Sequence, residues 1–66
     1  MKVILKVKEI RKRENITLRQ LSKKSGVSST HINNIEREVK EPSLLVIIKL
    51  AEALDKEITD LYYVRW

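Results

Sequence analysis

The feature that most constrains this chain is its single glycine, Gly26, which is followed two residues later by Ser28. Glycine adopts a positive φ without a steric cost and commonly ends a helix. Serine is a preferred N-cap, because its side-chain oxygen accepts hydrogen bonds from the free N–H groups of the next helix. A helix end and a helix start this close together predict two helices joined by one tight turn.

Apolar spacing and capping residues predict five helices. Thr17 and Gln20 form a Thr-x-x-Gln capping box at the start of the second helix, and Asn15 tolerates the left-handed conformation that ends the first. The expected helices cover about residues 6–14, 17–25, 29–37, 44–54 and 58–62. The apolar stripe expected to bury the fourth helix consists of Leu44, Ile47, Leu50, Ala51 and Leu54.

The two ends of the chain are less regular. Residues 1–7 loosely alternate lysine with aliphatic residues, a pattern compatible with either a short strand or a frayed arm. Residues 63–66 are expected to form a tail after the last helix.

Length and composition exclude several classes of protein. Sixty-six residues are expected to form one domain, residues 1–66. With no cysteine and one histidine, His31, no disulfide framework, metal site or cofactor is expected. The longest uncharged apolar run, Leu44–Ile48, is far shorter than the roughly 20 residues of a membrane span. An enzyme is not expected either, because His31 has no neighbouring nucleophile or carboxylate pair.

Charge is distributed unevenly along the chain. Residues 1–40 contain eleven Lys/Arg and four Asp/Glu, a net charge of +7, whereas residues 41–66 carry −2, for a total of +5. A basic half joined to a mildly acidic half suits a polyanion on one side of the molecule. An ordinary solvated basic surface is the alternative.

The third helix is expected to expose a polar face opposite its buried side. At about 100° per residue, Ile32 and Ile35 define the buried side. The opposite side carries Thr30, Asn33, Asn34 and Arg37. Amides and hydroxyls can hydrogen-bond base edges in the major groove, and Ser, Thr and Asn are poor helix formers that simple solvent exposure does not favour. We therefore prefer DNA readout, by a helix-turn-helix of about residues 17–37, to ordinary solvent exposure.

Basic residues flank this polar face. Arg19 and Lys23 lie on the outer face of the second helix, and Arg37 and Lys40 lie at the far end of the third. The start of the second helix adds free N–H groups and the positive end of a helix dipole. These groups, together with Asn33, are expected to contact DNA phosphates.

Taken together, these residues resemble the phage-repressor-like helix-turn-helix family of the Cro/C1, or xenobiotic-response-element, type. The matching positions extend over about residues 5–62: Ile10, Arg11, Thr17, Leu21, Gly26, Val27, Ser28, Ile32, Ile35, Glu36, Arg37, Pro42, Ser43, Leu44 and 51–54. The resemblance implies an all-α, compact five-helix lambda-repressor-like domain that binds a palindromic operator as a dimer.

The resemblance also implies roles for particular residues. Base readers fall on Ser28, Ser29, Thr30, His31 and Asn34. Phosphate contacts fall on Thr17, Leu18 and Arg37. Arg11 is implied to pair with Glu36, a partner that a carboxylate at the edge of the core needs. The chain departs from the family pattern at Leu18, where glutamine is common, and at Glu38, where glycine is common.

All aromatic residues lie at the C-terminus, as Tyr62, Tyr63 and Trp66. With Leu61 and Val64 they are expected to form a dimer surface over about residues 58–66. Covering the core is the alternative role for one or two of them. Leu45 adds an apolar side chain opposite the buried stripe of the fourth helix, flanked by Val46 and Ile48.

The sequence thus favours a sequence-specific DNA-binding transcriptional regulator, a repressor that binds operator DNA as a homodimer. A cytoplasmic, nucleoid-associated protein of bacterial or phage origin is expected, without a membrane partner or small-molecule ligand. The alternative is a protein-binding module, such as an antitoxin or an anti-repressor partner in a heteromeric complex, and co-purification of a second chain would favour it.

Overall fold

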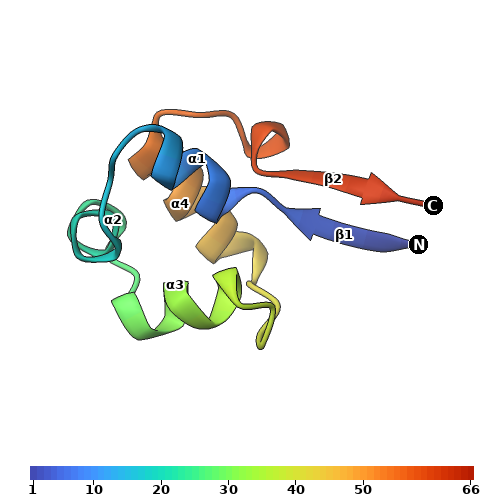
Figure 1. The fold of residues 1–66 in the computed structure, drawn as a ribbon, viewed down its shortest axis with the longest axis horizontal. Helices are drawn as coiled ribbons and strands as arrows, with labels where there is room; N and C mark the ends of the chain where they lie inside the picture. The colour runs from blue at the N-terminus through green and yellow to red at the C-terminus, as the bar shows by residue number, and fades with distance from the viewer.

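Four α-helices surround a small core, and a two-stranded sheet extends from it in the computed structural model, which describes residues 1–66 (Figure 1). The elements follow in the order β1 (Lys2–Leu5), α1 (Val7–Arg13), α2 (Leu18–Ser25), α3 (Ser29–Glu36), α4 (Leu44–Leu54), a 3₁₀ turn (Ile58–Asp60) and β2 (Tyr62–Arg65). The helices at the predicted positions are therefore present, except that the last one is a single 3₁₀ turn.

Side-chain caps begin three of the helices. The Gln20 N–H donates to Thr17 Oγ1 (3.0 Å) and the Thr17 N–H donates to Gln20 Oε1 (2.9 Å), which confirms the predicted capping box. Ser28 accepts from the His31 N–H (3.1 Å) at the start of α3, and Ser43 accepts from the Val46 N–H (3.2 Å) at the start of α4. These bonds satisfy N–H groups that have no partner inside the helix.

Left-handed residues end α2 and α4 and form the turn after α1. Gly26 follows α2 with a φ of +77°, Asn15 lies just after α1 with +58°, and Asp55 caps α4 with +57°. All three residue types tolerate this conformation better than most, so the chain reverses where the sequence predicted.

The core draws on every helix. It consists of Val7, Ile10, Leu21, Val27, Ile32, Ile35, Ile47, Leu50, Ala51, Leu54 and Leu61. The predicted inward positions on α3 and most of those on α4 are thus confirmed. Leu44 is the exception, because it starts α4 beyond the edge of the core and is exposed to solvent.

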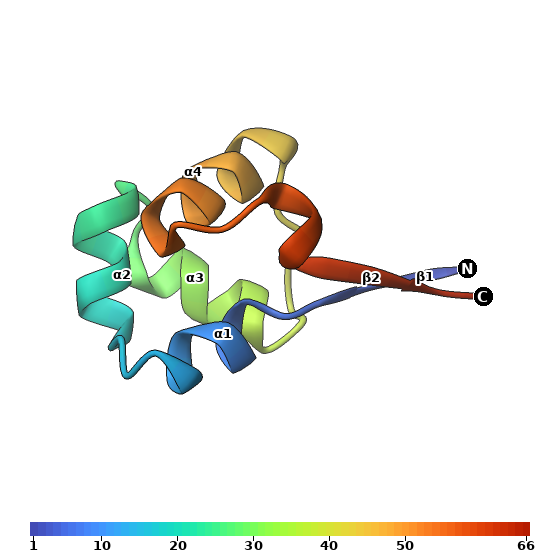
Figure 2. The same cartoon turned by 90° about the horizontal axis from the view of Figure 1, so that it is seen from above.

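The predicted all-α fold is wrong, because β1 and β2 form an antiparallel sheet. Leu5 pairs with Tyr62 and Lys2 with Arg65, and the Lys6 N–H continues the ladder by donating to the Leu61 carbonyl (2.7 Å). The two chain ends lie side by side in both views (Figures 1 and 2). Of the two alternatives for residues 1–7 the strand is therefore correct, and the predicted tail is its partner strand.

The sheet also changes the predicted dimer surface. Leu61 is fully buried in the core, so it cannot contact a partner chain. Tyr62 is half-buried beside it, so only part of its side chain is accessible. Leu61 is buried because the 3₁₀ turn brings the chain back across α4 before β2 begins. Tyr63 and Trp66 remain exposed, and Val64 is half-buried.

Candidate nucleic-acid interface

The turn between α2 and α3 sets how far α3 protrudes from the domain. In Figure 1, α2 is seen end-on whereas α3 lies across the bottom of the molecule, so the two helices cross at a large angle. Gly26 makes this possible through its backbone alone, since a Cβ atom built on it would meet no atom within 4 Å. The requirement for glycine is therefore one of φ and not of space.

Replacing Gly26 with valine is expected to destabilise the domain by about 1–3 kcal/mol, because a β-branched residue is strained at positive φ. Gly26→Asn is the matched control, since asparagine tolerates the same conformation. Thermal unfolding of both variants measures the difference. Equal melting temperatures for the two variants would show that strain at this φ is unimportant.

The exposed side of α3 is polar along its whole length. Ser28, Ser29, Thr30 and Arg37 are exposed, and His31, Asn33 and Asn34 are half-buried. Ile32 and Ile35, on the opposite side, are buried in the core. The polar side of α3 is therefore the side that faces away from the core.

A shallow hollow of about 470 Å³ joins the start of α2 to the first turns of α3. Leu18 and Arg19 line it from α2, and Ser29, Thr30 and Asn33 line it from α3. The structure thus brings together three of the residues predicted to contact phosphate, Leu18, Arg19 and Asn33, and two of the predicted base readers, Ser29 and Thr30. Asn33 shares this hollow, whereas His31 and Asn34 do not line it.

The start of α2 keeps two N–H groups without a protein acceptor. The capping box uses those of Thr17 and Gln20, and the Leu21 N–H donates to the Thr17 carbonyl (3.0 Å). The N–H groups of Leu18 and Arg19 have no such bond. Both N–H groups are therefore available to an anion, and the leucine at position 18 leaves the backbone donors of this helix end unchanged.

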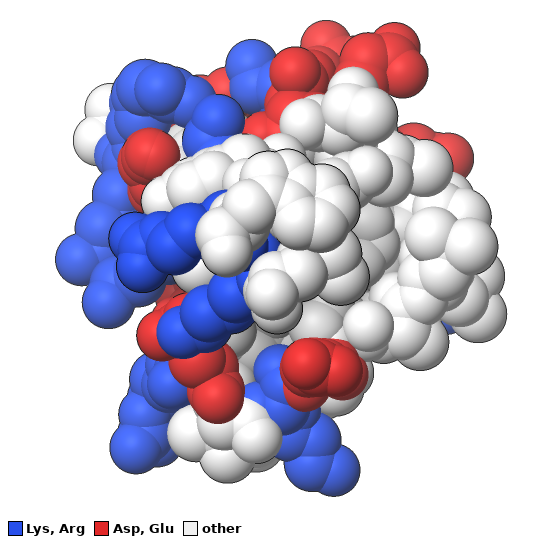
Figure 3. Space-filling view, turned by 90° about the vertical axis from the view of Figure 1, so that its right-hand side faces the viewer, with Lys and Arg blue, Asp and Glu red and all other residues white.

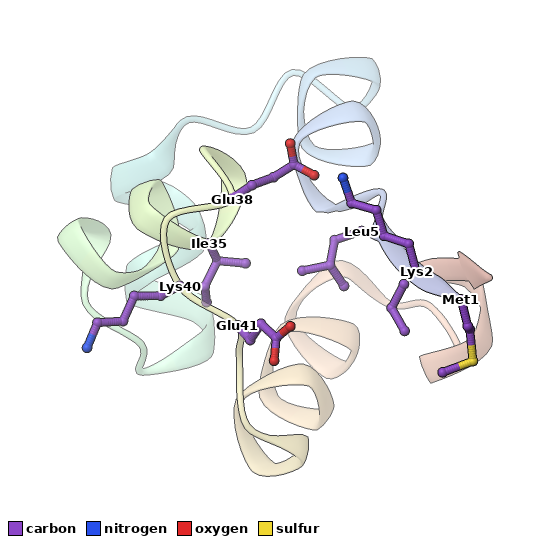
Figure 4. Close-up of a pocket in the computed structure, with 8 residues that line it drawn as sticks. Met1, Lys2, Leu5, Ile35, Glu38, Lys40 and Glu41 are labelled. Atoms are coloured by element: carbon purple, nitrogen blue, oxygen red, sulfur yellow. The ribbon is translucent and has the colours of Figure 1, made fainter. Parts of the chain in front are cut away.

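The loop after α3 closes tightly on the helix. The Asn34 carbonyl accepts from the N–H groups of Val39 (2.9 Å) and Lys40 (3.3 Å). Glu38 takes a φ of +61°, the conformation for which glycine is the usual residue. In Figure 4 the Glu38 carboxylate points toward the end of the Lys2 side chain, and Lys40 points away from the cavity that the other residues surround. Lys40 is therefore directed to solvent, whereas the Glu38 carboxylate is turned toward β1.

Arg11 joins α1 to the end of α3 and to the turn before α2. Its Nε donates to Glu36 Oε2 (2.8 Å) and its Nη2 donates to Glu36 Oε1 (3.0 Å). These two bonds form a bidentate salt bridge between α1 and the end of α3. Its Nη1 donates to the Ile16 carbonyl (2.9 Å) in the turn before α2. The sequence did not predict the contact with the Ile16 carbonyl, because every residue has a backbone carbonyl and residue type therefore gives no signal for it.

The ion pair between Arg11 and Glu36 favours the charged form of Arg11. Hydrogen bonding to Glu36 raises the pKa of the Arg11 guanidinium above its ordinary value, while burial opposes the rise and charge attraction supports it. A raised pKa means that the stabilisation is fully present below the unfolded-state pKa of arginine. Since it is lost only in strong alkali, the charge on Arg11 is constant near neutral pH.

Most basic side chains at this surface are free of ion pairs. The salt bridges in the structure join Arg11 to Glu36 and Lys56 to Glu14. The cations predicted to contact phosphate, namely Arg19, Lys23, Arg37 and Lys40, are exposed and unpaired. No carboxylate has to be displaced before they can meet an external anion.

The chain matches the helix-turn-helix family over residues 7–61, which include every helix described above. It therefore belongs to this family. None of its helices is both long and apolar enough to cross a bilayer.

Individual relatives agree with this assignment. The chain is 42% identical over 48 residues to the uncharacterized HTH-type transcriptional regulator y4dL of Sinorhizobium fredii, covering 73% of this chain and 24% of that one. It is 38% identical over 53 residues to the HTH-type transcriptional regulator SlrR of Bacillus subtilis, covering 79% and 35%. The chain thus spans well under half the length of these relatives.

A solved structure also resembles the fold. The restriction-modification controller protein C.AhdI from Aeromonas hydrophila superposes with a TM-score of 0.81 at 31% sequence identity, over 83% of each chain.

Proposed function

We propose that this chain is a sequence-specific DNA-binding transcriptional regulator, a repressor that binds a palindromic operator as a homodimer. The observation that carries the proposal is the exposed polar side of α3, which lies beside the open start of α2 and among unpaired basic side chains. Relatives named transcriptional regulators, and the likeness to a controller protein, support the same class.

The two helices have different tasks in this proposal. The N–H groups of Leu18 and Arg19 and the side chains of Thr17, Arg19, Lys23, Asn33, Arg37 and Lys40 hold phosphates on either side of the major groove. The start of α3 then enters the groove, where Ser28, Ser29, Thr30, His31 and Asn34 meet base edges. Phosphate contacts fix the register of the complex, and α3 selects the sequence.

Asn34→Ala is expected to weaken binding to the preferred site by about 1–3 kcal/mol and binding to random DNA only slightly, because Asn34 is assigned to a base edge and not to a phosphate. The preferred site is first selected from random DNA, and affinities for both DNAs are then measured at one salt concentration. Equal losses on the two DNAs would contradict a base-reading role.

Arg37→Ala is expected to weaken binding to both DNAs and to lower the slope of log affinity against log salt by about 1, because one phosphate contact is lost. Lys49→Ala is the matched control, since it removes an exposed cation from α4. A wild-type slope for Arg37→Ala, or an equal change in both variants, would contradict the phosphate role.

A further inference from the structure

The outer edge of β1 carries backbone groups without a partner. The sheet has two strands, so one edge of β1 is unpaired. The Lys6 N–H donates to the Leu61 carbonyl, and hydrogen-bonded pairs alternate along an antiparallel ladder, so Ile4 also directs its N–H and carbonyl groups toward β2. Those of Val3 and Leu5 point the opposite way, and the hydrogen bonds outside the helices and the sheet do not involve them. Together they present a row of free donors and acceptors along one side of the strand.

A groove follows this edge of β1. One hollow of about 390 Å³ lies between the strand and the loop after α3, and another of about 460 Å³ reaches the start of α1. Leu5, Ile35 and Glu38 line both hollows, which therefore form one groove along the strand. In Figure 4 the residues of β1 and those of the loop lie on opposite sides of the first hollow. Val3 and Leu5, the residues with free backbone groups, both line it.

The groove has an apolar floor and a charged rim. Ile35 is buried in the core at its floor, and Leu5 is half-buried beside it. The Glu41 carboxylate points into the hollow in Figure 4, and it is exposed and free of salt bridges. Figure 3, which looks onto the ends of the strands, shows charges of both signs toward the α3 side, whereas the α4 side is uncharged. A ligand that matches this groove has apolar side chains and a cation opposite Glu41.

The opposite edge of the sheet has no such groove. By the same alternation, Tyr62 and Val64 direct their backbone groups outward from β2. Val64 lines none of the hollows of the molecule, and Tyr62 lines only the one between the sheet and α4. An added strand would therefore find side-chain contacts along β1 and not along β2.

We infer that the outer edge of β1 binds an extended segment of a different protein, which joins the sheet as a third strand. Strand addition provides affinity through main-chain hydrogen bonds and specificity through alternate side chains. The segment directs apolar side chains toward Leu5 and Ile35 and a lysine or arginine toward Glu41. A second copy of this chain cannot supply its own β1 as that strand, because its loop after α3 already lies along the same edge.

The loop that forms the far wall of the groove connects this surface to α3. It begins at Arg37 and includes Lys40, and the Asn34 carbonyl holds it against the helix. A strand in the groove contacts the loop that carries these two cations, so we expect a bound partner to change the affinity for DNA. This consequence rests on the proposed function, whereas the addition of the strand does not.

Short peptides are the probe for this edge. Peptides from a random phage-displayed library are selected on the intact chain, and the affinity of each synthetic peptide is measured by fluorescence polarisation without DNA. We expect the selected sequences to contain alternating apolar residues and a lysine or arginine. Bound peptide should slow hydrogen exchange of the Val3 and Leu5 amides in NMR spectra and leave those of Tyr62 and Val64 unchanged.

Backbone N-methylation distinguishes the two edges. Introduced at Val3 by chemical synthesis, it removes an outward N–H and keeps both the side chain and the hydrogen bonds to β2. N-methylation at Val64 is the matched control, because the two valines are paired across the sheet and both N–H groups point outward. We expect peptide affinity to fall about 10-fold or more for the Val3 variant and to stay unchanged for the Val64 variant.

Side-chain variants test the predicted cation. Glu41→Gln should weaken peptide binding about 3-fold, because an exposed ion pair is lost. Glu52→Gln is the control, since it removes an exposed carboxylate from α4. Circular dichroism checks that every variant is folded.

Three results would overturn the inference: no peptide that binds the folded chain, equal losses for the two N-methylated variants, or protection of β2 in place of β1. Self-association that only the Val3 variant loses would identify a second copy as the added strand and would also overturn it. If peptides bind β1 but DNA is bound without sequence preference, only the proposed function fails. If DNA is read and no peptide binds, only this inference fails.

Discussion

Replacing Glu36 with alanine is expected to destabilise the fold by about 3–5 kcal/mol, because it leaves the Arg11 guanidinium buried without its partner. The Glu36 side chain is 3% exposed and Arg11 is 10% exposed, so water can replace little of the lost interaction. Unfolding in urea measures the loss. Arg11→Ala should have a similar effect, with the added loss of the bond to the Ile16 carbonyl.

The second salt bridge provides the control. Glu14 and Lys56 lie 3.0 Å apart, but their side chains are 32% and 35% exposed, so Glu14→Ala should cost less than about 1 kcal/mol. A double-mutant cycle on Arg11 and Glu36 isolates their coupling. Additive effects of the two substitutions, or equal losses for Glu36→Ala and Glu14→Ala, would show that the buried pair does not hold α3 in place.

Leu61→Ala is expected to cost about 2–5 kcal/mol, because a fully buried leucine is cut back at the point where β2 leaves the core. Deleting all residues after Asp60 should cost more, since β1 then loses its partner strand as well. We therefore expect the truncated chain to be unfolded.

Thermal or urea unfolding of the full-length Leu61→Ala variant measures its loss of stability. Trp66→Ala is the control, because Trp66 is almost entirely exposed and its removal should change stability by less than about 0.5 kcal/mol. If Leu61→Ala were as harmless as Trp66→Ala, the end of the chain would have to be dispensable for folding.

Much of the candidate site could be predicted because its signals are local. The capping box of Thr17 and Gln20, the N-cap of Ser28 and the left-handed Gly26 each depend on a few neighbouring residues. The spacing of Ile32 and Ile35 orients α3, since one helix face must be buried. The roles of individual side chains toward DNA remain predictions.

Elements that depend on distant partners were less predictable. Residues 2–5 form a strand only because residues 62–65 return to lie beside them, and a strand of four residues has little preference of its own. The aromatic residues at the C-terminus suggested one continuous partner surface, but strand alternation places Tyr62 and Tyr63 on opposite sides of the sheet.

By itself, then, the sequence determined four helices, the turn between α2 and α3, and the polar side that α3 exposes. Backbone conformation, capping and helical periodicity act over a few residues, so these features can be deduced without the rest of the molecule. Only the tertiary structure decided that Leu61 is core, that Leu44 is exposed, and that Arg11 also binds the Ile16 carbonyl. Burial and long-range pairing depend on which segments meet in space, and that follows from packing of the whole chain.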